Sequence, residues 1–175
     1  MESDLRRWME LVENGSLRGS KIADIDFDDA VRHHDLPDAG GITDYRQAFK
    51  DAKADLARMF ARQKVLTIYR ALVTDISELD TDRTGIAWAW EAEGALRGSD
   101  IGKTDTSGLL LEGRVATTQV NWHLTIAMNA FDPEEREIVL VRGASVTLIS
   151  VHNAQGYRVG AEITPPALRG IIIRA

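Results

Sequence analysis

The period of the hydrophobic pattern changes once along this chain of 175 residues, near Val65. Before that point apolar residues recur every three to four positions, which is the spacing of one helix face. The clearest case opens at Thr43 or Asp44, and its apolar face carries Tyr45, Phe49, Ala52, Leu56, Met59 and Phe60. Beyond Val65, short runs of β-branched and aromatic residues bounded by polar turns predict strands. Helices followed by strands favour an α+β fold over an alternating α/β fold.

The expected elements follow from this change of period. The first part predicts a helix from Ser3 to about Gly15, a short one over residues 27–33, and the helix that opens at Thr43. The second part predicts a helix over 122–131 and strands at 66–73, 86–90, 109–117, 138–141, 145–151 and 170–174. We expect one domain over residues 1–175, in which the helices of residues 1–64 pack on two small, mostly antiparallel sheets formed by residues 65–175.

Charge and composition narrow the functional classes. The net charge of −6 disfavours general binding to nucleic acid or to an anionic membrane, because both need clustered Lys and Arg. The chain has no cysteine, which excludes disulfides and thiolate zinc sites, and its histidines are not spaced as metal ligands. The first fifteen residues are charged throughout and do not have the apolar centre of a signal peptide. We expect a cytoplasmic protein without a bound metal.

Three features follow one another in the strand-rich part. Tyr69 and Arg70 lie inside the first expected strand, an aromatic run over 86–90 forms the second, and Glu135 and Glu137 enter a later one. With their surroundings at 66–71, 121–129 and 133–143, they resemble the ADP-ribosyltransferase superfamily, in its Arg…Ser-Thr-Ser…Glu-x-Glu branch. The resemblance covers residues 66–151, about half of the chain. It implies that NAD is held in a sheet-rich core as the substrate.

The resemblance also implies roles for these residues. Glu137 takes the catalytic position and Glu135 the one that activates the acceptor, while Arg70 binds the NAD diphosphate. These residue types suit the chemistry, because a carboxylate stabilises the positive ribose that forms as nicotinamide leaves, and a guanidinium binds phosphate oxygens in pairs. Residues two apart in a strand share a face, so Glu135 and Glu137 are expected to converge. Tyr69 and Trp88 are counted with the cofactor-binding residues, although Trp88 also fits a core position.

One departure from the family pattern leaves the activity open. Ala87 and Ala89 stand where the branch carries hydroxyl residues, and alanine has no polar atom to hold a catalytic glutamate. The chain therefore fits an NAD-dependent mono-ADP-ribosyltransferase of the small bacterial-toxin or phage type, acting on a protein arginine. It also fits a binding module on the same fold that has lost catalysis. A third reading is an unrelated α+β interaction protein whose acidic surface meets a basic partner. Taken alone, the acidic run that contains Glu135 and Glu137 is typical of a solvated turn.

The segment from Gly98 to Gly108 resembles a phosphate-binding loop in composition. Its first two glycines, Gly98 and Gly102, are separated by three residues instead of four, and a helical pattern, not a strand, precedes it. We interpret this segment as a flexible loop that closes over the site.

Overall fold

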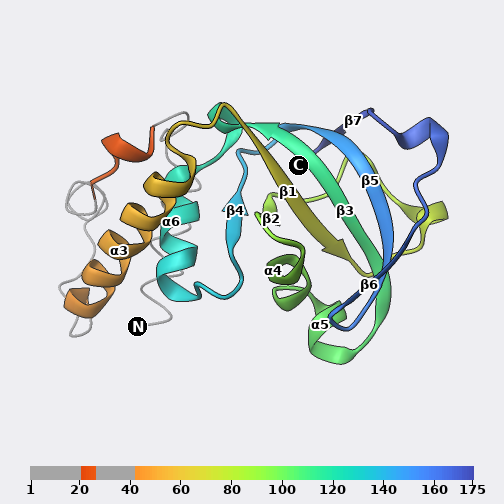
Figure 1. The fold of residues 1–175 in the computed structure, drawn as a ribbon, viewed down its shortest axis with the longest axis horizontal. Coiled ribbons are helices and arrows are strands. Elements are labelled where there is room, and N and C mark those ends of the chain that lie inside the picture. Colours follow the sequence, from red (N-terminus) through yellow and green to blue (C-terminus); the bar gives the residue numbers. More distant parts are fainter. Residues whose placement is uncertain (1–20, 27–41) are drawn as a thin grey trace.

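The computed structural model describes residues 21–26 and 42–175, and these form an α+β arrangement of helices and one antiparallel sheet (Figure 1). The helices are α3 (Ile42–Phe60), α4 (Ala92–Arg97), α5 (Asp100–Thr104) and α6 (Trp122–Phe131). The strands are β1 (Val65–Leu72), β2 (Ala87–Ala89), β3 (Ser107–Ala116), β4 (Glu137–Val139), β5 (Ser145–Gln155), β6 (Arg158–Glu162) and β7 (Ile172–Arg174). The helices expected at 3–15 and 27–33 lie outside the described residues.

The strands are hydrogen-bonded into a single sheet, so the expectation of two small sheets is wrong for the described part of the chain. The order is β4-β2-β1-β3-β5-β6, with β7 also paired to β5. A single sheet results because β1 pairs with β2 along one edge and with β3 along the other. The two ladders differ in length: β1 and β3 align over eight residue pairs, whereas β1 and β2 align only at Tyr69 and Ala89. The sheet is therefore narrow at the junction of β1 and β2.

Alternation along β1 divides the apolar residues between two cores. Leu66 and Ile68 point into the larger core, which also takes Phe49 and Leu56 from α3 and much of α6. Ala71 points to the other face, into a smaller cluster under α4 and α5 that contains Leu96, Ile101, Leu110 and Ala154. Helices α3 and α6 pack side by side at the β4 end of the sheet (Figure 1). The smaller core, covered by α4 and α5, is the one beside the candidate site.

Most of the expected elements are confirmed, within three residues at nearly every boundary. Helix α6 has the predicted bounds. Strand β6 was missed because all five of its residues are exposed, so no buried face marks it in the sequence. The expected loop over 98–108 is wrong in part, since it contains α5 and the start of β3. No helix in the described ranges is long and apolar enough to cross a bilayer.

Candidate functional site

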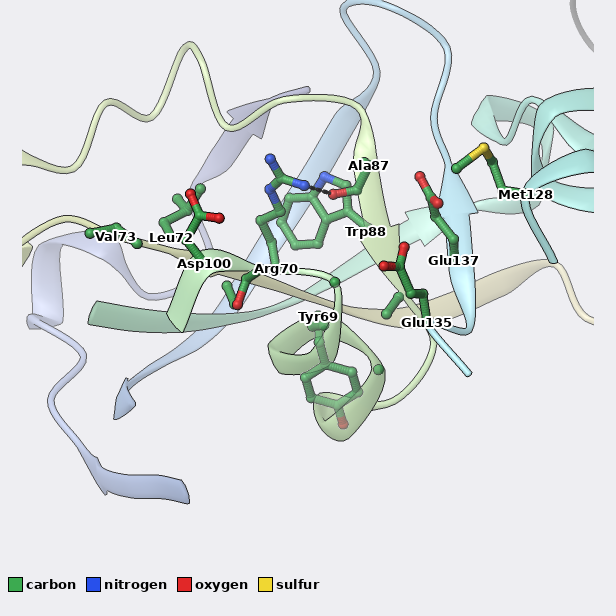
Figure 2. A pocket seen from close by; sticks show the side chains of 16 residues that line it. Tyr69, Arg70, Leu72, Val73, Ala87, Trp88, Asp100, Met128, Glu135 and Glu137 are labelled. Atoms are coloured by element: carbon green, nitrogen blue, oxygen red, sulfur yellow. Dashed lines mark hydrogen bonds between the residues drawn. The ribbon is translucent and has the colours of Figure 1, made fainter. Parts of the chain in front are cut away.

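A cavity of about 430 Å³ opens between α4 and the sheet where β1 and β2 separate (Figure 2). Its volume is in the range of small-molecule sites. It is lined from β1, β2, α4, the start of α5, Met128 of α6, the turn before β4 and the first residue of β4. Arg70, Glu135 and Glu137 all line it, so the three residues that the sequence pattern singled out contribute to one cavity.

Glu137 reaches this cavity from the first position of β4. Its ladder partner is Ala89 of β2, which is in turn the partner of Tyr69 of β1. Partners directly across an antiparallel ladder project from the same face of the sheet. Glu137 therefore lies at the end of a row of paired residues that runs across β4, β2 and β1.

Helix α6 fixes the backbone of Glu137 from the outer edge of β4. The Asn129 side chain accepts a hydrogen bond from the Glu137 N–H (3.1 Å) and donates one to the Glu137 carbonyl (2.7 Å). One turn earlier, the Thr125 hydroxyl accepts from the Val139 N–H (3.0 Å). These side chains replace a neighbouring strand, so the polar groups at this edge of the sheet are satisfied. Asn129 and Thr125 were not predicted from the sequence, in which the available signal was two polar residues four apart in an apolar helix.

Glu135 lies in a turn and not in the strand, so the prediction that strand alternation brings it beside Glu137 is wrong. Arg136 has a φ of +50°, which breaks the extended backbone between the two acids. The turn is fixed against α4 by ion pairs of Arg136 with Glu91 and of Arg97 with Glu134. It is also held by close packing, because a Cβ on Gly94 would lie 2.5 Å from the Glu135 carbonyl oxygen.

Arg70 approaches from the gap between β1 and β2. Its guanidinium donates a hydrogen bond to the backbone carbonyl of Ala87 in β2. Burial lowers the pKa of Arg70, and the charge of Glu137 partly offsets this. Arg70 forms no ion pair with a carboxylate of the described residues, and its Nε has no hydrogen-bond partner. A half-buried cation whose hydrogen bond goes to a neutral carbonyl, and not to a carboxylate, is a favourable site for an anion.

The electrostatics of Glu137 are unusual for a carboxylate. Burial raises its pKa to about 7, with further increases from Glu135 and Asp132 and an opposing decrease from Arg70. A carboxyl group with a pKa near neutrality exchanges protons readily at physiological pH and suits acid–base or charge-stabilising roles. Glu137 is therefore the residue of the cavity that is best suited to acid–base or charge-stabilising chemistry.

Two residues expected to bind the cofactor are placed differently. Trp88 is only 2% exposed and its indole N–H donates to the Gly85 carbonyl (2.9 Å), so its ring belongs to the core and offers no face for stacking. Tyr69 projects from the opposite side of β1 to Arg70 (Figure 2), and its ring packs against the smaller core, as Ala92 and Ala95 of α4 also do. Both line the cavity, but the structure gives neither ring a stacking position.

The alanines in β2 leave the Glu137 carboxylate without a donor. Ala89 lies directly across the ladder from Glu137, at the position where a hydroxyl would be nearest. No side chain in the described part of the chain donates a hydrogen bond to this carboxylate, and burial is the main cause of its raised pKa. A ligand that brings positive charge or hydrogen-bond donors would therefore stabilise the ionised form.

The described residues contain no cluster of three or more histidines or acidic residues that could hold a metal ion. No protein-family model matches this chain, and neither a curated protein nor a solved structure matches it.

Proposed function

We propose that the cavity binds NAD and that the protein is a mono-ADP-ribosyltransferase acting on a protein side chain, an arginine by the resemblance in sequence. The observation that carries the proposal is that Arg70, Glu135 and Glu137 line one cavity although they come from a central strand, a turn and an edge strand. The guanidinium of Arg70, which forms no ion pair with a described carboxylate, suits the diphosphate, and the two carboxylates suit the ribose and the acceptor.

In the proposed reaction the bond between nicotinamide nitrogen and ribose C1′ breaks, and nicotinamide leaves neutral with the electron pair. The ionised Glu137 stabilises the positive charge that develops on the ribose, and a guanidine nitrogen of the acceptor bonds to C1′. Glu135 takes the proton that the acceptor nitrogen releases. The nicotinamide ring of bound NAD is itself cationic, so it lowers the pKa of Glu137 and favours the ionised form that this step needs.

The proposal is tested by incubating the purified chain with NAD and measuring free nicotinamide, alone and with a small guanidine as acceptor. We expect release by the wild type and a loss of at least about a hundredfold in E137Q, because the variant keeps the shape and removes the charge. E135Q should lose transfer to the guanidine more than it loses nicotinamide release. The exposed E78Q variant is the matched control for the loss of one carboxylate.

A second candidate is supported by Ala89, which leaves Glu137 without a hydroxyl partner. The chain would then be a binding module that holds NAD without cleaving it. Binding of NAD measured by calorimetry, with no nicotinamide release, would favour this candidate. If NAD neither binds nor raises the melting temperature, both proposals fail, because a ligand that prefers the folded state must stabilise it.

A further inference from the structure

Asp100 contributes a third carboxylate to the cavity, at the end away from Glu135 and Glu137. It lines the cavity from the first position of α5, together with Leu72 near the end of β1. Leu72 is three residues beyond Tyr69, whose row contains Glu137, and three residues of strand span about 10 Å. In Figure 2 the charged side chains follow the same order, with Arg70 between Asp100 and the acid pair.

The backbone of Asp100 is firmly held although its side chain is exposed. Its neighbour Ile101 is fully buried and packs against the start of β3, where a Cβ on Gly108 would lie 2.5 Å from the Ile101 side chain. A Cβ on Gly102 would lie 2.3 Å from the Leu96 carbonyl oxygen, so α5 packs closely against the end of α4. The Thr104 hydroxyl donates to the Asp100 carbonyl (2.5 Å). This part of the expected flexible loop is therefore a closely packed helix that forms a wall of the cavity.

The Asp100 carboxylate makes no hydrogen bond or ion pair with the residues that the structure describes, so its acceptor oxygens are available to a ligand. A carboxylate repels phosphate and accepts hydrogen bonds from hydroxyl groups. A ligand whose diphosphate contacts Arg70 would extend a sugar, not a further phosphate, toward Asp100. Adjacent ribose hydroxyls are well suited to a carboxylate, as in dinucleotide sites where an acidic residue binds the 2′-hydroxyl.

We infer that Asp100 is a specificity-determining residue that accepts hydrogen bonds from the hydroxyls of the adenosine ribose and excludes a 2′-phosphate. The inference rests on the proposed function, since it assumes that the cavity holds an ADP-ribosyl group. It adds the orientation of the ligand, with the reacting ribose at Glu137 and the adenosine ribose at Asp100. It also restricts the substrate to NAD and not its 2′-phosphorylated form.

The experiment compares binding of ADP-ribose and 2′-phospho-ADP-ribose by calorimetry, because neither ligand carries nicotinamide and neither is consumed. We expect the wild type to bind ADP-ribose at least about tenfold more tightly. D100N keeps the size of the side chain without its charge, and D100S replaces it with a smaller group that tolerates a phosphate. In both variants we expect the preference to fall below about threefold. E93Q, in a residue of α4 that does not line the cavity, should keep the wild-type preference.

The outcomes separate this inference from the proposed function. If ADP-ribose binds but the wild type accepts both ligands equally, or D100N and D100S keep the wild-type preference, the role of Asp100 is refuted and NAD binding stands. If neither ADP-ribose nor NAD binds to the folded wild type, the proposed function and the inference are both refuted.

Discussion

The raised pKa of Glu137 predicts a specific pH dependence of stability. The carboxyl titrates at about 7 in the folded chain against 4.5 for an unperturbed glutamate, mainly because burial disfavours its charge. Between these two values the unfolded chain releases the proton while the folded chain retains it. The free energy of unfolding therefore falls as pH rises through this window and is level above it. Replacing Glu137 by glutamine removes this dependence.

The size of the effect follows from the two pKa values. Relative to its fully protonated state, the wild type has lost about 0.8 kcal/mol at pH 5 and about 3.3 kcal/mol at pH 8. The stability of E137Q relative to the wild type should therefore increase by about 2.5 kcal/mol between these pH values. For a chain of this size, that corresponds to roughly 5–10 °C in melting temperature. Other groups that titrate in both proteins cancel in the comparison.

The assay is urea unfolding of both proteins at pH 5, 6, 7 and 8, followed by tryptophan fluorescence. E78Q, which removes an exposed carboxylate, controls for the change in net charge. A difference between E137Q and wild type that stays constant within about 0.5 kcal/mol over this range would refute the reasoning. It would mean that Glu137 is solvated in the folded chain and does not lie in the environment described above.

Further predictions concern the groups around this carboxylate. NAD affinity, measured by calorimetry at each pH, should increase up to about tenfold from pH 6 to pH 8 in the wild type, because the ionised Glu137 carboxylate binds the cationic nicotinamide ring. In E137Q the affinity should stay level over the same range. N129L should lower the free energy of unfolding by at least about 2 kcal/mol, because it leaves the Glu137 N–H and carbonyl unpaired, and it should impair nicotinamide release. T125V removes the equivalent hydrogen bond to the Val139 N–H, so it should lower the free energy of unfolding by about 1–3 kcal/mol and leave nicotinamide release nearly intact. Equal losses of nicotinamide release in N129L and T125V would show that Asn129 has only a structural role. G94A should lower the melting temperature and weaken NAD binding, because its Cβ would displace the Glu135 turn; an unchanged melting curve would contradict the close packing seen here.

Local sequence was sufficient for much of the fold. The helix that ends at Phe60 and the α6 helix follow from apolar residues at helical spacing, and β1, β3 and β5 follow from long runs with a buried alternating face. The resemblance carried by the order of three motifs, at 69–70, 86–90 and 135–137, was enough to group Arg70, Glu135 and Glu137 as a candidate site. Strand β6 was not predictable, since both its faces are exposed and no period distinguishes it from a loop.

The tertiary structure determined how the site is assembled. Strand alternation predicts that Glu135 and Glu137 share a face, but the left-handed backbone at Arg136 and the packing of the turn on Gly94 position Glu135 instead. Asp100 enters the cavity because Ile101 is buried against strands distant in the sequence. Local sequence encodes period and charge through neighbouring residues, whereas contacts between distant segments depend on how the whole sheet and its helices pack. That packing determines which charged side chains meet in one cavity.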